Sequence, residues 1–460
     1  MHLRPYQDDA VSQLRAAYSS GKRAPLFCLP TGGGKTFVFS YVARNATARG
    51  NRVCILVHRQ ELLLQASRSL TEIGVPHGII APGHIQNQHP VQVASVQTLG
   101  RRIAKMRYDF DLIIIDEAHH AVAGTWKRLI EAMPNARVLG VTATPVRSDG
   151  RGLCEVFDDL VIGPSVASLI DMGFLVRPVV YAPPTAVDLS GVRRKGGDYD
   201  QRELATRMDK PRITGDAVAH YTKHSPGKPS IVFCASVAHA QHVAMQFTAA
   251  GYSARSIDGS MLDTDRRQAI ADLANGRLQV LTSCDIVSEG TDIPVVETAI
   301  LLRPTQSLGL YLQQVGRALR PAPGKERALI LDHVGNCLRH GLPDDQREWS
   351  LDAAPRANRA ANDNEPNITV KQCEKCFAVF KPSLVCPACG HVHAPKSREI
   401  EQAEGELSEV NADLLRSQQR REIGQARTLE QLKEIAKQRG YHQGWAFRIW
   451  EARTKKYART

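Results

Sequence analysis

The chain has 460 residues, of which 43% are hydrophobic, and it carries a formal net charge of +12. This length predicts two to four domains, at roughly 150 residues per domain, rather than a single core. The apolar runs are too short to span a membrane and the first residues lack the apolar segment of a signal peptide, so we expect a cytoplasmic protein. Its ten cysteines should then be reduced or bound to metal. The positive charge favours a polyanionic partner, nucleic acid before membrane.

Short Val/Ile/Leu runs alternate with amphipathic stretches from the start of the chain to about Ser350. Examples are "VCILV" at 53–57, "LIIID" at 112–116 and "SIVFC" at 230–234. Continuous apolar runs of this kind are typical of strands buried on both faces of a parallel sheet, and helical patterns lie between them. The sequence therefore predicts an α/β fold. A polar, Gly-rich stretch that starts at Ser190 is predicted to be a loop or an insertion early in the second domain.

The first candidate functional motif is "LPTGGGKT", which follows the apolar run "PLFCL" and precedes a helical pattern. Its glycines allow successive backbone N–H groups to turn toward one anion at a helix N-terminus. Lys35 is predicted to reach the β- and γ-phosphates of ATP, and the Thr36 hydroxyl to hold Mg²⁺. Leu29 stands where the strict phosphate-loop pattern has a glycine, so a plain Gly-rich turn is the alternative. The predicted nucleotide-binding residues of this loop are Thr31, Gly32, Gly33, Gly34, Lys35 and Thr36.

Two carboxylates and two imidazoles follow three isoleucines in "IIIDEAHH". Taken alone, this stretch fits a zinc site, a magnesium site or the solvated end of a buried strand. A phosphate-binding loop upstream favours magnesium, because paired carboxylates and phosphates suit Mg²⁺ whereas zinc prefers His and Cys. Asp116 is predicted to complete the Mg²⁺ shell, and Glu117 to orient and deprotonate the attacking water. His119 is predicted to couple Glu117 to neighbouring residues, while His120 is assigned no role.

Further motifs complete a series that resembles the superfamily 2 helicases. Besides the two motifs above, the series comprises "LRPYQ", "CILVHRQELLLQ", "VASVQTL", "VTATPVR", "SIVFCASVAHA", "TSCDIVSEGTDIP" and "QQVGRALRP". With the four cysteines that follow, it is most similar to the RadD-like bacterial and phage DNA helicases. The resemblance implies an ATP-dependent DNA helicase or translocase that acts in DNA repair, recombination or replication. An RNA helicase, a duplex translocase, or a nucleic-acid-binding switch or loader without unwinding activity are the alternatives.

The resemblance also implies an architecture. Residues 1–175 and 176–350 would form two tandem RecA-like domains with ATP between them. Arg317 and Arg320 would be arginine fingers that the second domain delivers to the γ-phosphate, and Gln313 would position the water. A basic helix face is the alternative for this segment.

Other roles implied by the resemblance concern residues of both domains. Arg4 and Gln7 would frame the adenine, and Gly290 and Asp292 would meet the ribose and the γ-phosphate side. Thr142 and Thr144, in "TAT", would link the ATP state to contacts between the domains; ordinary strand-end threonines are the alternative. Cys284 stands where many relatives have a threonine that touches nucleic acid, so that contact is not carried over.

Three residues that follow predicted strands of the first domain are candidates for contacts with a nucleic-acid backbone. They are His58, Arg59 and Thr98. Surface residues of these types are common, so an ordinary surface position is the alternative.

The composition changes near Leu351. The stretch at 351–369 is rich in Ala, Asn, Asp and Pro and predicts a linker. Two C-x-x-C pairs separated by nine residues follow in 370–395: Cys373, Cys376, Cys386 and Cys389. Doubled pairs at this spacing predict a structural Zn²⁺ ribbon, with a redox pair as the alternative. The linker predicts that the ribbon folds independently of the larger domains.

The remaining 65 residues, 396–460, are predicted to form a basic helical region. Thr428 and Gln431 fit a capping box at the start of a helix. The tryptophans at 445 and 450 are interpreted as part of a small helical core rather than as stacking platforms for bases. The basic residues around them are candidates for contact with nucleic acid or with a protein partner.

Overall fold

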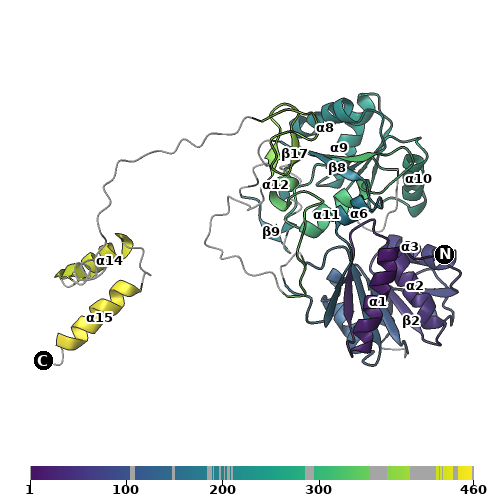
Figure 1. Ribbon diagram of the computed structural model, residues 1–460, viewed down its shortest axis with the longest axis horizontal. Coiled ribbons are helices and arrows are strands. Elements are labelled where there is room, and N and C mark those ends of the chain that lie inside the picture. Colours follow the sequence, from purple (N-terminus) through teal and green to yellow (C-terminus); the bar gives the residue numbers. More distant parts are fainter. Residues whose placement is uncertain are drawn as a thin grey trace. The chain divides into compact units, whose positions relative to one another are not determined.

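The computed structural model divides the chain into two compact units, residues 1–394 and 395–460, which are described separately. The residues that it describes are 2–103, 109–147, 151–183, 189, 191–195, 198–200, 203–204, 208, 211–284, 295–352, 370–393, 421–423, 425–426, 428–438 and 444–457. The first unit contains two large sheets with helices on their faces (Figure 1).

The first sheet has seven parallel strands in the order β3-β4-β2-β5-β6-β1-β7. In chain order the strands are β1 (Pro25–Cys28), β2 (Val53–Val57), β3 (His77–Ile80), β4 (Val91–Ser95), β5 (Leu112–Asp116), β6 (Arg137–Thr142) and β7 (Asp159–Ile162). Its helices are α1 (Pro5–Ser19), α2 (Lys35–Thr47), α3 (Gln60–Glu72), α4 (Val96–Arg102) and α5 (Gly124–Glu131), with a 3₁₀ turn at Ala118–His120.

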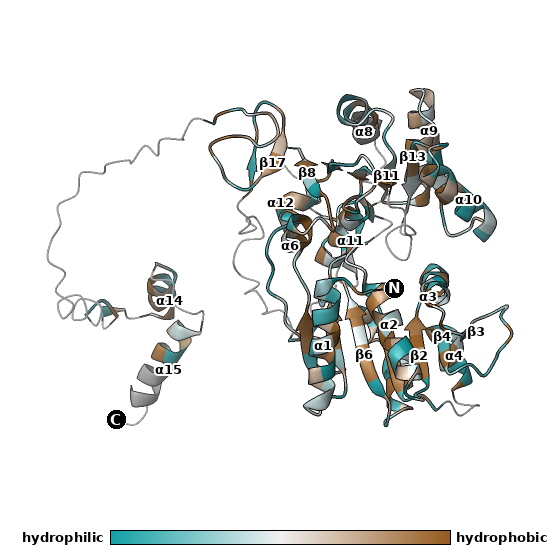
Figure 2. Cartoon of the chain, turned by 45° about the vertical axis from the view of Figure 1, so that its right-hand side comes forward, coloured by the Kyte–Doolittle hydropathy of each residue, from teal (hydrophilic) through white to brown (hydrophobic). Residues whose placement is uncertain are grey.

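Helices cover both faces of this sheet, which explains the continuous apolar runs. In β2, Val53 and Ile55 belong to one hydrophobic core, whereas Cys54 and Leu56 belong to the core on the opposite face. Helices α1, α2 and α3 contribute to the first core, and α4 and α5 to the second. Figure 2 shows hydrophobic colour along the strands and hydrophilic colour on the outer helical surfaces.

The second sheet has eight strands in the order β12-β13-β11-β14-β15-β8-β17-β16. Its parallel strands are β8 (Arg177–Tyr181), β11 (Ser230–Phe233), β12 (Ala254–Ile257), β13 (Val280–Ser283), β14 (Thr298–Leu301) and β15 (Arg327–Asp332). Its helices are α8 (Pro211–His224), α9 (Val237–Ala249), α10 (Asp263–Ala274), α11 (Leu308–Ala318) and α12 (Asn336–His340), and α6 (Val166–Asp171) precedes it. The predicted α/β class with two parallel-sheet domains is confirmed.

The predicted insertion contains a short antiparallel pair, β9 (Arg194–Lys195) and β10 (Asp198–Tyr199). Asp198 accepts hydrogen bonds from the Thr305 hydroxyl, at 2.8 Å, and from the Gln306 backbone N–H, at 2.7 Å. Both partners lie just before α11, so the insertion braces the entry to that helix.

The four-cysteine segment is not independent of the second domain, contrary to the expectation from the linker. Its strand β17 (Ala378–Phe380) pairs antiparallel with β8, and β16 (Lys371–Gln372) pairs with β17. The ribbon therefore extends the second sheet at the edge that β8 would otherwise leave open. Most of the predicted linker lies outside the described residues. Leu351 packs on the first domain, where its carbonyl accepts from the Leu153 backbone N–H at 2.7 Å.

The second unit contains α14 (Leu429–Gln438) and α15 (Trp445–Tyr457). The predicted capping box is confirmed, because the Gln431 backbone N–H donates to the Thr428 hydroxyl, at 3.2 Å, and Thr428 N–H donates to the Gln431 side chain, at 3.3 Å. Trp445 and Trp450 pack against a small core around Leu432, as predicted. None of the described helices is long and apolar enough to cross a membrane.

Candidate functional site

The Gly-rich loop joins β1 to the N-terminus of α2. Gly32 and Gly34 have φ angles of 87° and 88°, in the left-handed region that glycine occupies at little cost. Gly34 is the N-cap of α2, and the Lys35 amine donates to the Leu29 carbonyl at 3.1 Å. Leu29, which stands where the strict pattern has a glycine, is fully buried beneath the loop and contacts Gly33. Its side chain therefore packs in the core and does not occupy the phosphate-binding side of the loop. A helix N-terminus, two left-handed glycines and a lysine make this loop suited to bind phosphate.

The N-terminus of α1 packs on this loop. The Tyr6 hydroxyl donates to the Gly33 carbonyl at 2.8 Å, and the Gln7 amide donates to the same atom at 3.3 Å. The Arg4 backbone N–H donates to the Gln7 side chain at 3.0 Å, and the Arg4 guanidinium lies 4.4 Å from the centre of the Phe174 ring. Gln7 thus contacts the loop and Arg4 contacts Gln7, while their predicted role toward the adenine stays a prediction. Sequence reasoning missed Phe174, which no local pattern marks.

The two carboxylates lie at the end of β5. This strand pairs with β6, and β6 pairs with β1, which leads into the Gly-rich loop. Asp116 is 5% exposed and Glu117 is 7% exposed. Glu117 has a φ of 49°, which costs a non-glycine residue about 1–2 kcal/mol and signals a position held by its surroundings. Its backbone N–H donates to the Asp116 carboxylate at 3.0 Å.

His119 joins Glu117 to two threonines, one at the end of β6 and one just beyond it. Its Nδ1 lies 3.4 Å from a Glu117 carboxylate oxygen and 3.2 Å from the Thr142 hydroxyl. The Thr142 hydroxyl in turn donates to the Thr144 carbonyl at 2.9 Å. The structure therefore brings together four residues that the sequence singled out in two separate motifs.

Helix α11 carries the second domain's candidate residues to the first domain. The Gln313 amide donates to the Glu117 carboxylate at 3.4 Å. At Gly316 an added Cβ would lie 2.6 Å from the Thr31 Cβ, so only glycine allows this approach of α11 to the loop. A Cβ on Gly32 would lie 3.4 Å from the Arg320 side chain.

Opposite charges converge where these elements meet. Burial lowers the pKa of the Lys35 amine; the Glu117 and Asp116 carboxylates act in the opposite direction, and Arg317 acts in the same direction as burial. Burial lowers the pKa of the Arg320 guanidinium to about 10, so this side chain stays charged at neutral pH. Three cations beside two carboxylates suit a polyphosphate together with a divalent cation, because cationic side chains bind phosphate oxygens and carboxylates bind Mg²⁺. The Asp116 carboxylate and the Thr36 hydroxyl are oxygen donors of the kind that Mg²⁺ prefers.

The candidate nucleic-acid contacts lie at the ends of two neighbouring strands. His58 and Arg59 follow β2, Thr98 lies in α4 after β4, and these two strands are paired. The Gln97 amide donates to the His58 carbonyl at 3.3 Å. His120, which the sequence left without a role, has its ring 4.7 Å from that of His58 and 4.1 Å from that of His119. Gly290 and Asp292 lie outside the described residues.

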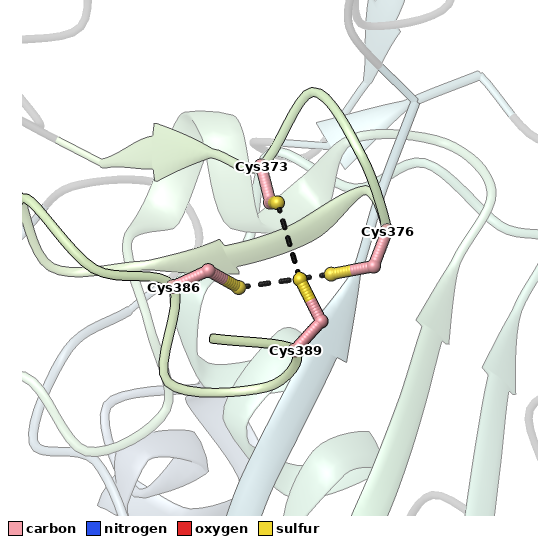
Figure 3. Close-up of side chains that lie close together, drawn as sticks. All are labelled: Cys373, Cys376, Cys386 and Cys389. Atoms are coloured by element: carbon pink, nitrogen blue, oxygen red, sulfur yellow. Dashed lines mark hydrogen bonds between the residues drawn. The ribbon is translucent and has the colours of Figure 1, made fainter. Parts of the chain in front are cut away.

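The four cysteines of the ribbon form a compact cluster (Figure 3). Their sulfur atoms all lie within 4.8 Å of one another, with 3.6 Å between Cys373 and Cys389 and 3.7 Å between Cys376 and Cys386. Disulfide-bonded sulfurs would be about 2 Å apart. A tetrahedron of thiolates about 2.3 Å from a zinc ion has edges of nearly 3.8 Å, so the cluster fits a Zn²⁺ site.

Comparisons with known proteins agree with this geometry. Residues 1–147 match the family "Type III restriction enzyme, res subunit", and residues 210–322 match the family "Helicase conserved C-terminal domain". A 51.5 kDa protein of a Lactococcus phage is 36% identical over 363 residues, which are 79% of this chain and 76% of the phage protein. The putative ATP-dependent helicase IRC3 of Saccharomyces cerevisiae is 32% identical over 72% of this chain, which spans about half (51%) of the yeast protein.

Solved structures share the fold. A fragment of a putative HsdR subunit of a type I restriction enzyme from Vibrio vulnificus superposes with a TM-score of 0.60 at 22% sequence identity. That match covers 75% of this chain and 67% of the other. Both halves of the ATP cleft thus fall within matched family models, and the paired RecA-like sheets have a solved counterpart. The chain belongs to the superfamily 2 helicases, ATP-hydrolysing enzymes that act on nucleic acid through two RecA-like domains.

Proposed function

We propose that this protein couples ATP hydrolysis to movement along, or unwinding of, DNA. The observation that carries the proposal is the hydrogen bond between Gln313 and Glu117, which joins the second domain to the candidate catalytic carboxylate of the first. A motor needs such a link, because closure of the two domains must change the geometry of the catalytic groups around the reacting phosphate. A binding switch or loader would not require it.

The candidate residues divide the chemistry between the two domains. Backbone N–H groups of the Gly-rich loop and Lys35 hold the phosphates, and Thr36 and Asp116 hold Mg²⁺. Mg²⁺, when bound, neutralises phosphate charge. Glu117 accepts the proton of the attacking water, and Gln313 keeps that carboxylate oriented.

The second domain supplies positive charge opposite the loop. Arg317 and Arg320 lie three residues apart, the first in α11 and the second just beyond its end, and both stabilise charge that develops on the transferred phosphoryl group. Hydrolysis is therefore fast only when α11 is packed against the loop. Nucleic acid bound across both domains would favour that closed state and raise turnover.

The base and ribose contacts complete the nucleotide site. We assign the adenine to the region of Arg4 and Gln7, where Phe174 adds an apolar surface. Gly290 and Asp292 keep the roles that the resemblance implies, toward the ribose and the γ-phosphate side.

DNA is the proposed polyanion, and the net charge of +12 and the match to a restriction-enzyme family support this choice. We assign backbone contacts to His58, Arg59 and Thr98, which follow the carboxyl ends of the paired strands β2 and β4. The chain most resembles the RadD-like helicases, and repair, recombination or replication is its proposed setting. The basic C-terminal region is the candidate site for a protein partner.

The test measures ATPase activity with single-stranded DNA, duplex DNA and RNA in parallel, together with displacement of a labelled strand. We expect DNA to stimulate turnover at least about tenfold and more than RNA does. Stimulation by RNA alone would make the protein an RNA helicase. An ATPase indifferent to all three would point to a switch or loader, and stimulation by duplex without strand displacement to a duplex translocase.

Variants that cannot bind zinc should keep their basal ATPase activity. We propose that the cysteine cluster holds a structural Zn²⁺, and we expect the double variant Cys386→Ser with Cys389→Ser to bind none. The ATP-site residues lie outside β16 and β17, so basal ATPase should stay within about twofold of wild type. The DNA concentration for half-maximal stimulation should rise about tenfold if the ribbon contributes a second DNA contact.

Because β17 extends the second sheet, the same double variant should unfold a few degrees lower. Metal content, thermal unfolding and ATPase activity provide the measurements. Cys154→Ser, at an exposed cysteine of the first domain, is the matched control and should change none of them. Absence of zinc from the wild-type protein would refute the metal assignment. Collapse of basal ATPase would show that the ribbon is needed to hold the ATP cleft together.

A further inference from the structure

A buried lysine lies in the turn that follows the arginine-bearing helix. Lys325 is 8% exposed, and its ammonium group donates to three backbone carbonyls: Val296 at 2.6 Å, Ala318 at 2.5 Å and Arg320 at 2.6 Å. An ammonium has three protons, so all of its donors are used.

The three acceptors belong to the segments that position Arg320. Ala318 is the last residue of α11, and its carbonyl is one of those that a helix C-terminus leaves without a backbone donor. The second acceptor is the carbonyl of Arg320 itself. Val296 lies two residues before strand β14 (Thr298–Leu301), so the ammonium ties the end of α11 to the second sheet.

A helix can end without a buried charge. Helices commonly end in a glycine turn whose backbone N–H groups bond the last carbonyls, without any buried charge. Here a charge is taken out of water, and its acceptors are neutral carbonyls. A positive charge at a helix C-terminus does match the helix dipole, but its burial still carries a desolvation cost. That cost suggests a task other than stability.

We propose that Lys325 is a positioning residue that holds the end of α11 and the Arg320 backbone in the geometry that directs Arg320 to the ATP phosphates. The inference rests on the role proposed above for Arg320. Arg320 reaches the loop near Gly32 from a turn with two prolines and a left-handed Gly324, and a small shift of this turn would move its guanidinium away.

The lysine also gives the proposal a pH signature. Burial lowers the pKa of Lys325 to about 8; nearby Glu297 acts to raise it, and nearby Arg320 acts to lower it. The Glu297 carboxylate is itself bonded to Lys228, at 3.2 Å. Above pH 8 the amine loses a proton and with it one of the three hydrogen bonds, so turnover should fall as pH rises through this value.

Stability should move in the opposite direction. The unfolded chain keeps the lysine protonated up to its ordinary pKa of 10.5, whereas the folded protein releases the proton near 8. Between these values the unfolded state binds more protons, so this group makes the folded state relatively more stable as pH rises. A fall in turnover above pH 8 without a fall in thermal stability excludes unfolding as its cause. Burial also lowers the pKa of Lys35, so the Lys325→Arg variant, which leaves Lys35 unchanged, assigns the fall to Lys325.

The experiment compares Lys325→Met, Lys325→Arg and a control, Lys22→Met, in the full chain with DNA. Lys22 also donates to a backbone carbonyl, that of Asp158, but at the surface. At pH 7.5 we expect the Met variant to lose about tenfold or more in kcat while its KM for ATP changes less than about threefold. The Arg variant should recover part of kcat and lose the fall near pH 8, because its charge persists. The control should match wild type.

Wild-type kcat in Lys325→Met, with or without lower thermal stability, would overturn the proposal and leave Lys325 a structural cap. A wild-type profile that stays flat from pH 7 to 9 would also overturn it, even if both variants fail to fold. The variant Arg320→Ala distinguishes a failure of the Lys325 positioning role from a failure of the Arg320 finger role. If Arg320→Ala loses turnover while Lys325→Met does not, only the positioning role fails; if Arg320→Ala turns over normally, the assignment of the finger fails.

Discussion

Glu117→Gln should bind ATP within a few-fold of wild-type affinity and hydrolyse it about 10²–10⁴ times more slowly. An amide has nearly the size and shape of the carboxylate, so it can occupy the same buried position at φ 49° beside Asp116. It cannot accept the proton of the attacking water. The Gln313 amide could still donate to the new amide oxygen, but that hydrogen bond would no longer have a charged acceptor.

Binding of a fluorescent ATP analogue and steady-state turnover with saturating DNA provide the two measurements. Glu131→Gln is the matched control, because Glu131 is exposed at the end of α5 in the same domain. Ordinary turnover in Glu117→Gln would mean that another group activates the water. Loss of ATP binding would instead assign Glu117 to ground-state charge balance with Lys35.

Arg320→Ala should lose about 10³-fold in kcat with a much smaller change in ATP affinity. A finger that meets charge developing in the transition state contributes to the reaction step more than to ATP binding. The pKa of Arg320 is lowered to about 10, so its charge is complete at pH 7.5 and the variant removes a full cation.

The measurement pairs kcat with the dissociation constant of a non-hydrolysable ATP analogue. Arg267→Ala in α10 is the control, since this exposed arginine of the same domain donates to the Asp263 carbonyl within its own helix. Equal losses in kcat and affinity would make Arg320 a ground-state contact. No loss in either would assign the finger role to Arg317 alone.

Local chemistry was readable from the sequence because each unit of it is contiguous. The loop from Thr31 to Thr36 needs only its own glycines and a following helix to present N–H groups. Asp116 and Glu117 need only the buried strand that ends beside them. The spacing of the paired cysteines predicted their cluster, and the strand at 53–57 was predicted to be buried on both faces because every residue in it is apolar.

Tertiary structure decided how these units meet. Gln313 and Glu117 are 196 residues apart, and no local pattern marks their contact. Phe174 beside Arg4 and Val296 beneath Lys325 are likewise products of chain packing. The linker composition predicted an independent ribbon, yet β17 pairs with β8 of the second sheet. β17 could pair with β8 only because β8 lies at an open edge of the second sheet. The two strands are almost 200 residues apart, so no short-range sequence pattern predicts their pairing.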